Sequence, residues 1–219
     1  MGNLANKTGI LFYTFTFSLF QFDEKYVKMI LYILTLWRLK IRWGDKNVVR
    51  RLFVEKKKGF DIEAQQLLSD LIYSLNIDKN AEIRLFNRYD VEGLGDDDFE
   101  RAKVTIFSEP NVDNVFSEYL PLTADWQYFA TEYLPGQYDQ RADSAAQCIQ
   151  LQTGGERPKV ATAQVIALRG KISAGDLMKV RAYVVNPVES RVASNAKPSS
   201  LDLHAEPPAD IKKIENFIK

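Results

Sequence analysis

The chain has 219 residues, of which 46% are hydrophobic and 12% aromatic, and this is enough to bury the core of one or two domains. Its 29 Lys and Arg residues balance its 29 Asp and Glu residues, so no overall field draws it to nucleic acid or to an anionic membrane. With one cysteine and one histidine, Cys148 and His204, it cannot form an internal disulfide and is poor material for a zinc site or a Cys-His nucleophile. A lone cysteine fits a reducing compartment, and we expect a cytoplasmic protein.

Residues 1–46 differ from the rest of the chain, and we expect them to be an unstructured extension that is foreign to the fold. They hold two apolar runs, Ile10–Phe22 and Met29–Trp37. Both fall short of the roughly 18–20 apolar residues that span a bilayer, and the first lacks a small-residue cleavage site. A peripheral membrane anchor stays open as an alternative, because basic residues flank the aromatic ones; these are Lys28, Arg38, Lys40 and Arg42.

From Val48 onward, two successive stretches show the same order of strand, helix, strand and helix. The first is predicted to hold a strand over Val48–Val54, a helix beginning after Asp61, a strand over Glu82–Val91, and a helix with Phe99, Ala102 and Ile106 on one face. After a connector over Asn111–Asp125, the second is predicted to hold a strand over Trp126–Leu134, a helix over Gln140–Leu151, a strand over Lys159–Leu168 and a helix over Ala174–Val185.

The helices carry recognisable packing faces and termini. Asp61 and Asp139 are placed to cap their helices, and Ser173 with Asp176 matches a capping box. Gly154 is placed to end a helix. The apolar faces are formed by Ala64, Leu67, Leu68, Leu71, Ile72 and Leu75 in the first half, and by Ala142, Ala145, Ala146 and Ile149 in the second.

Two further features suggest chemistry but are better explained by structure. The acidic turn Asp96-Asp97-Asp98 could hold a cation, but carboxylates are favoured at helix starts in any case, so we expect a capping role. Cys148 lies beside Ile149 in a helix, and we expect it to be a packed small residue. The sequence therefore predicts no catalytic residue and no metal ligand.

Four pairs of turn or strand-end residues share one offset of 77 positions: Glu55 and Glu132, Gly59 and Gly136, Gly93 and Gly170, and Pro110 and Pro187. We therefore predict an α+β fold in which two tandem β-α-β-α repeats, over residues 47–118 and 126–190, pack as one pseudo-two-fold domain. Residues 191–219 contain Pro198, Pro207 and Pro208 and show no periodicity, so we expect a linker or an extended arm.

The helix start at Gln140 is the most unusual part of the chain. Arg141 lies where the helix macrodipole disfavours a cation, by roughly 0.3–1 kcal/mol, so a nearby anion is expected. That anion could be internal, from Glu132, Asp139 or Asp143. Alternatively, the helix start could face a neighbouring domain or an anionic ligand, because a polar stripe follows it along the helix. The candidate docking residues are Gln140, Arg141, Asp143, Ser144 and Gln147.

Five separated motifs, in this order, resemble the N-terminal region of phosphoribosylformylglycinamidine synthase in its large, single-chain form. They are Phe53-Val54-Glu55-Lys56-Lys57, Asn87-Arg88-Tyr89-Asp90-Val91, Phe107-Ser108-Glu109-Pro110, the segment Tyr133–Cys148, and Asn186-Pro187-Val188-Glu189-Ser190. The resemblance covers about residues 48–219. In that family this region resembles two fused copies of the small purine-synthesis subunit, followed by the start of a linker domain.

The resemblance implies an N-terminal fragment of an enzyme of purine biosynthesis that is inactive by itself. The family converts formylglycinamide ribonucleotide to its amidine with ATP, Mg²⁺ and ammonia released from glutamine, using domains that lie C-terminal to the region present in this chain. ATP and Mg²⁺ are thus implied for the full-length family and not for this chain. We expect a scaffold that docks the synthetase and glutaminase domains, in cis or in trans. The alternative is a free-standing, non-catalytic interaction protein. A variant of this alternative, which we favour less, is associated with a membrane through its N-terminus.

Overall fold

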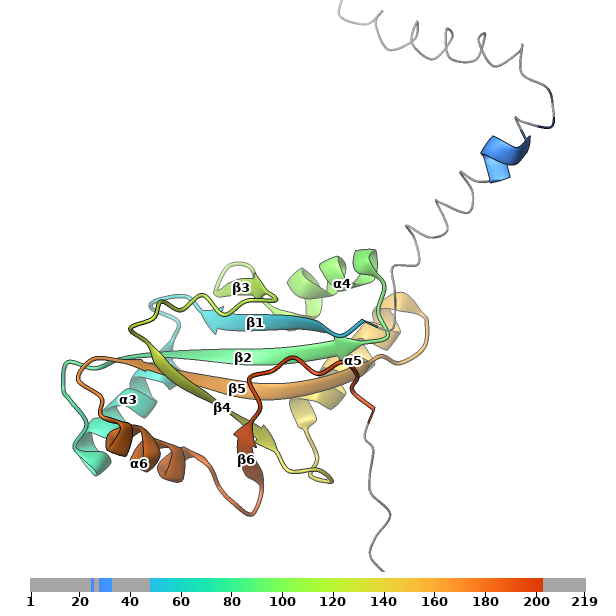
Figure 1. Cartoon of the computed structure of the whole chain (residues 1–219). Helices are drawn as coiled ribbons and strands as arrows, with labels where there is room; N and C mark the ends of the chain where they lie inside the picture. Colours follow the sequence, from blue (N-terminus) through green and yellow to red (C-terminus); the bar gives the residue numbers. More distant parts are fainter. Residues whose placement is uncertain (1–24, 26–27, 33–47, 203–219) are drawn as a thin grey trace, which may run out of the picture.

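The computed structural model describes residues 25, 28–32 and 48–202, and the folded domain lies within the last of these ranges (Figure 1). Six antiparallel strands form one sheet in the order β3-β1-β2-β5-β4-β6. The strands are β1 (Arg50–Lys56), β2 (Glu82–Glu92), β3 (Asp113–Ser117), β4 (Gln127–Tyr133), β5 (Lys159–Arg169) and β6 (Ser190–Ala193). The helices are α3 (Ile62–Leu75), α4 (Asp96–Ala102), the π-helical segment η2 (Lys103–Phe107), α5 (Gln140–Thr153) and α6 (Ala174–Val184). The predicted α+β class is confirmed.

The sheet is built around its two longest strands. β2 and β5 pair over their whole length, from Glu82 opposite Arg169 to Glu92 opposite Lys159. Because side chains alternate between the two faces of a strand, each strand contributes to two separate cores. One face packs against the helices and the other packs against a core that contains no helix residue, which includes Phe53, Phe86 and Val165.

The helix-covered face joins the two halves of the chain into one core. In one cluster α5, through Ala145 and Ile149, packs on Leu52 and Val91 from the first half. In the other cluster α3, through Ala64 and Leu71, packs with Phe129, Ile166, Leu168 and Val180 from the second half. Each of these helices packs on a strand of its own half, α5 on β5 and α3 on β2, and its apolar face also meets side chains from the other half. The two halves therefore share their core, and neither has a complete core by itself.

The predicted helix termini are confirmed in part. Asp139 accepts a hydrogen bond from the amide of Ala142 at 2.9 Å, and Ser173 and Asp176 form the reciprocal capping box. Gly154 ends α5 in the left-handed conformation. Asp61 occupies the N-cap position of α3, but its carboxylate accepts from the amide of Gly59 and the side chain of Gln65 and does not cap the helix.

Four other expectations are wrong in detail. The acidic residues Asp96-Asp97-Asp98 lie in the first turn of α4, after the N-cap residue Gly95. Their negative charges interact favourably with the helix dipole, but none of these side chains caps the helix. Cys148 is exposed, because it falls at the edge of the apolar face of α5 rather than within it. The expected connector contains the edge strand β3, and β6 begins at Ser190 where an irregular arm was expected.

Most of the predicted N-terminal extension lies outside the described residues, including the run Ile10–Phe22 and the basic residues Arg38, Lys40 and Arg42. Residues 28–32 are helical, and the side chains of Met29, Ile30, Leu31 and Tyr32 are exposed. Over residues 25, 28–32 and 48–202, none of the helices combines the length and the apolar character needed to cross a membrane. Residues 203–219 of the expected C-terminal arm also lie outside the described part of the chain.

Candidate functional site

The start of α5 borders a cleft of about 650 Å³ on the helix-covered side of the sheet. We call it the α5 cleft. Its floor comes from β4 and β5, and its walls come from the first turns of α3 and α5 and from the segment before β6. The residues that line it include Glu63, Thr131, Gln140, Arg141, Ser144 and Gln164. A second cleft, of about 840 Å³, borders the start of α3, and we call it the α3 cleft. Gln164 and Glu63 line both clefts, which therefore meet at the middle of the sheet.

Arg141 does not pair with any of the anions proposed from the sequence. Its guanidinium donates to the side-chain carbonyl of Asn87, on the central strand β2. The candidate carboxylates are engaged elsewhere: Glu132 pairs with Arg191, Asp143 pairs with Arg157, and Asp139 caps the helix. The cation at the helix start is thus held by a neutral amide, and its charge is available to a partner in the α5 cleft.

Across the same cleft, α3 makes a matching contact with the other central strand. The side-chain amide of Gln164 on β5 donates to the Glu63 carboxylate at 2.8 Å. An amide from each central strand therefore contacts a charged side chain from the helix that faces it. These two contacts tie the first turns of α3 and α5 to the middle of the sheet, so the cleft walls are held in place.

Asp139 anchors the start of α5 to β5 as well as capping it. One carboxylate oxygen accepts from the amide of Ala142, and the other accepts from the hydroxyl of Thr162 at 2.7 Å and from its amide at 3.3 Å. The pairing of β4 with β5 ends at Thr131 and Gln164, so Asp139 bonds to the backbone of β5 just beyond that pairing. The position of the helix start is therefore set by the central strand β5 and not only by the helix.

The predicted docking residues divide into two groups. Gln140, Arg141 and Ser144 line the α5 cleft and are exposed. Gln147 is exposed further along the helix, and Asp143 faces the other way, toward Arg157 and Tyr138. The Tyr138 hydroxyl donates to Asp143 at 3.1 Å, and this hydrogen bond raises the pKa of Tyr138 above its usual value. Asp143 therefore fixes the turn before α5 and is not part of the cleft.

Sequence reasoning missed the partners of these residues. Asn87 and Gln164 lie in the middle of long strands, and no local pattern distinguishes them from other polar residues on a sheet. The one available signal was the offset of 77 positions, which relates Asn87 to Gln164 and Glu63 to Gln140. The two residue pairs that this offset relates are therefore the four residues whose side chains lie around the junction of the two clefts.

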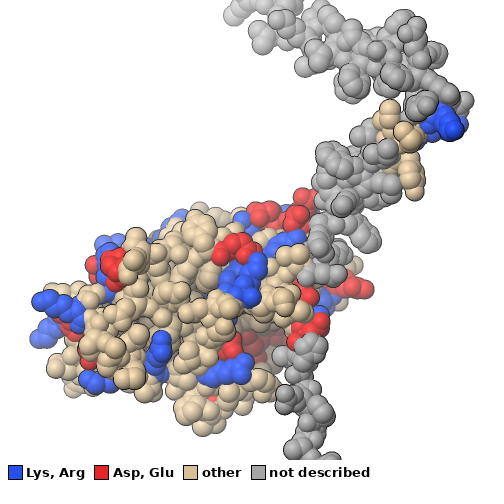
Figure 2. Space-filling view, in the orientation of Figure 1, with Lys and Arg blue, Asp and Glu red and all other residues tan. Residues whose placement is uncertain are grey.

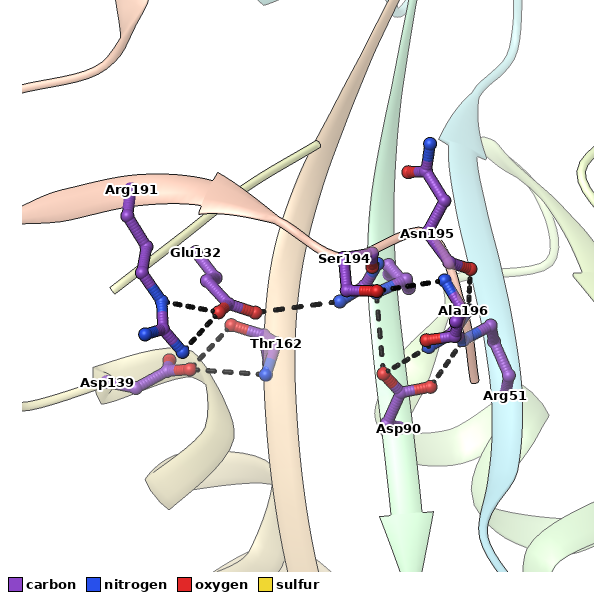
Figure 3. A network of polar contacts seen from close by, with 10 residues as sticks. Arg51, Asp90, Glu132, Asp139, Thr162, Arg191, Ser194, Asn195 and Ala196 are labelled. Atoms are coloured by element: carbon purple, nitrogen blue, oxygen red, sulfur yellow. Dashed lines mark hydrogen bonds and ion pairs between the residues drawn. The ribbon is translucent and has the colours of Figure 1, made fainter. Parts of the chain in front are cut away.

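The opposite face of the sheet carries a second polar feature, a buried charge network (Figure 3). Asp90 receives two hydrogen bonds from Arg51, at 2.6 and 2.9 Å, and lies 3.4 Å from Nε of Arg88. Arg88 also lies 3.7 Å from Glu132, which in turn pairs with Arg191 at 2.8 Å. The side chains of Arg51, Arg88 and Asp90 are 4–7% exposed, so this is a buried cluster of charges and not a solvated surface.

Burial is the largest influence on the pKa of Arg88. It lowers the pKa of the guanidinium below its usual value; the nearby charge of Arg51 acts in the same direction, while Asp90 and Glu132 oppose it. Figure 2 shows this face of the molecule, where charged side chains are scattered between broad uncharged areas. The buried cluster is therefore not part of a large single-sign surface that would attract nucleic acid.

Hydrogen bonding and ion pairing are the chemistry that these two features offer. Within the described residues, no group of three or more His, Cys, Asp and Glu side chains could hold a metal ion. No protein-family model, no curated protein and no solved structure matches this chain. The class of molecule is thus defined by its geometry: an α+β domain with a polar cleft at the middle of one face and a buried charge cluster on the other.

Proposed function

We propose that residues 48–202 form the N-terminal, small-subunit-like scaffold of a phosphoribosylformylglycinamidine synthase, made of two tandem copies of one β-α-β-α unit. In this proposal the module acts in the cytoplasm and performs no chemistry itself. It docks the synthetase and glutaminase parts of the enzyme, which use ATP, Mg²⁺ and glutamine, through the α5 side of the domain. The proposal rests on the five resembling motifs and on two properties of the fold.

The first supporting property is the spacing of the elements. β4 begins at Gln127, 77 positions after β1 begins at Arg50, and β5 begins at Lys159, 77 positions after β2 begins at Glu82. The last residues of β1 and β4 are also 77 positions apart, and so are the last residues of β2 and β5. Two pairs of glycines at the same offset share a positive φ: Gly59 and Gly136, and Gly93 and Gly170. Duplication of one unit accounts for all of these coincidences at once.

The second property, the register between β2 and β5, carries the proposal. Asn87 lies opposite Gln164, and these two residues are also 77 positions apart. An axis that relates two copies must pass between equivalent residues, so a two-fold axis through this pair is consistent with the strand order β3-β1-β2-β5-β4-β6. The α3 and α5 clefts then occupy equivalent places on either side of that axis.

The two copies differ where docking is proposed. Gln140, Ser144 and Gln147 on α5 correspond to Glu63, Leu67 and Asp70 on α3 at the same offset. A solvated helix usually carries Lys and Glu on its exposed face, whereas Gln and Ser can bond to another protein surface without the desolvation cost of a charge. We therefore assign the docking role to α5, with Arg141 as the charged residue at its start.

Rescue of a truncated enzyme tests this function. A large-form phosphoribosylformylglycinamidine synthase that lacks its own N-terminal module is assayed for glutamine-dependent ADP formation, with and without the 219-residue chain. We expect activity with the chain present and no activity from the chain alone. Ser144→Arg on α5 should reduce the rescue, whereas the matched Ser69→Arg on α3 should not.

The outcomes separate the competing functions. Turnover by the chain alone would show that it is an enzyme in its own right and would refute the scaffold role. Binding without rescue would favour the free-standing interaction protein. Absence of both binding and rescue would count against every docking function proposed for this chain.

A further inference from the structure

The segment that follows β6 lies across the face of the sheet that carries no helices. In Figure 1 it passes in front of β5 and β2, and it ends where Asp202 pairs with Lys159, the first residue of β5. The side chains of Ser194, Asn195, Ala196 and Lys197 are exposed, while the main chain of the segment contacts the sheet. We call residues 194–202 the arm.

Two buried arginines hold the first part of the arm by its main chain (Figure 3). Arg88 donates to the carbonyl of Ser194 at 2.8 Å. Arg51 donates to the carbonyls of Asn195 at 2.8 Å and Ala196 at 3.3 Å. These contacts use no side chain of the arm, so its position should depend little on which residues occupy 194–196.

Charged contacts also hold the second part of the arm. Lys197 pairs with Glu118 at 2.6 Å. The Glu92 carboxylate accepts from the amide of Leu201 at 2.6 Å and from the hydroxyl of Ser200 at 3.2 Å. Asp202 pairs with Lys159 at 2.5 Å. The arm is therefore fixed at its beginning, its middle and its end.

The buried charge network gives a reason for this attachment. Arg51 and Arg88 present two buried cations to the single buried carboxylate of Asp90, with the partly buried Glu132 as a more distant partner. A buried guanidinium with unbonded N–H groups is costly, and the arm carbonyls supply three of the acceptors that these two arginines need. Arm and network therefore stabilise each other.

The arm also determines where the chain leaves the domain. Asp202 lies beside Lys159, which is paired with Glu92 at the end of β2. The neighbouring residue Val91 lies opposite Arg50, at the start of β1. The point of exit is thus brought to the same end of the sheet as the point where the described chain enters the domain.

We propose that the arm is a latch, closed by the recognition of its main-chain carbonyls by Arg51 and Arg88, which holds whatever follows Asp202 at this one end of the sheet. The latch does not depend on the proposed enzymatic context, because it rests on contacts within residues 48–202 alone. When closed, it holds Leu201 and Asp202 against Glu92 and Lys159; when open, these two residues are released from the sheet.

Amide hydrogen exchange on the full 219-residue chain tests the latch. In the unmodified chain we expect the amide of Leu201, which bonds to Glu92, to be protected. Arg88→Lys keeps the charge but loses the planar fork, and it should speed exchange at Leu201 by about tenfold or more while β2 and β5 stay protected. Arg84→Lys is the matched control, because Arg84 lies on the same face of β2 but donates to the carbonyl of Pro121 and not to the arm.

Two variants within the arm keep the proposal testable if Arg88→Lys unfolds the domain. Lys197→Glu places two carboxylates together at Glu118 and should also speed exchange at Leu201. Asn195→Ala should leave exchange unchanged, because only the main-chain carbonyl of residue 195 is bound. An unprotected Leu201 amide in the unmodified chain overturns the latch, and an equal effect of Asn195→Ala and Lys197→Glu overturns main-chain recognition.

Discussion

Replacing Asp90 by alanine probes the buried charge network most severely. Asp90 has a 4% exposed side chain and is the carboxylate that receives both hydrogen bonds from Arg51. It also lies 3.4 Å from Arg88. The Asp90→Ala variant leaves two buried guanidinium groups facing each other, with Glu132 as the remaining nearby acid.

The expected loss of stability follows from this burial. Removing one partner of a buried ion pair costs about 3–5 kcal/mol, because the remaining charge stays desolvated. Domains of this size are stable by roughly 5–15 kcal/mol, so the variant should stay folded but with much of its stability gone. An exposed pair gives the contrast: Glu100 and Lys103 are one helical turn apart at 2.9 Å, with Glu100 65% exposed, and Glu100→Ala should change the stability by less than about 1 kcal/mol.

Urea unfolding of both variants, followed by circular dichroism, measures the difference. The free energy of unfolding should fall by about 3 kcal/mol or more for Asp90→Ala, and very little for Glu100→Ala. A loss below about 1 kcal/mol for Asp90→Ala would mean that Arg51 and Arg88 find water or other acceptors, and the buried network would then not be a stabilising element.

Three further results are expected. Arg141→Ala should change the free energy of unfolding by less than about 1 kcal/mol in a urea titration, because the lost hydrogen bond to Asn87 is offset by removing a cation from the helix start; a loss of several kcal/mol would show a buried partner instead. Asp176 has a pKa below its ordinary 3.8, chiefly because of the Ser173 hydroxyl. Its contribution to stability is therefore complete above that pH and is lost as the pH falls through the lowered value. An NMR titration of its carboxyl carbon should show this, and Ser173→Ala should raise the pKa; an unchanged midpoint would contradict the assignment. Gly170→Ala should lower stability by about 1–3 kcal/mol in thermal unfolding, since φ is +134° and the new Cβ would lie 3.1 Å from Cα of Ala81; an unaffected melting temperature would refute this.

The long elements of the fold could be predicted from sequence because their patterns are local. The apolar face of α5, formed by Ala142, Ala145, Ala146 and Ile149, is buried as its spacing indicated. β3 and β6 could not be predicted in the same way, because they have five and four residues and too few positions to show alternation. They are strands because β1 and β4 offer free edges, which is a property of the assembled sheet.

Only the part of the candidate site that comes from α5 could be predicted from the sequence. The polar residues at the start of α5 stand out in the sequence, but the amides that meet them, Asn87 and Gln164, come from the middle of distant strands. The buried charge network was missed for a different reason. Arg51, Arg88 and Asp90 alternate with apolar residues, which is typical of a solvent-facing side of a sheet. Here the arm covers that side, and no local pattern indicates it.

The scaffold role is tested most directly by sedimentation velocity. The 219-residue chain is mixed with the synthetase and glutaminase part of a large-form phosphoribosylformylglycinamidine synthase that lacks its own N-terminal module. We predict a co-sedimenting complex whose affinity falls about tenfold or more with Arg141→Ala, as expected for a charged residue at the centre of an interface, and stays unchanged with Arg101→Ala on α4. A chain that sediments alone at every concentration would contradict the scaffold role.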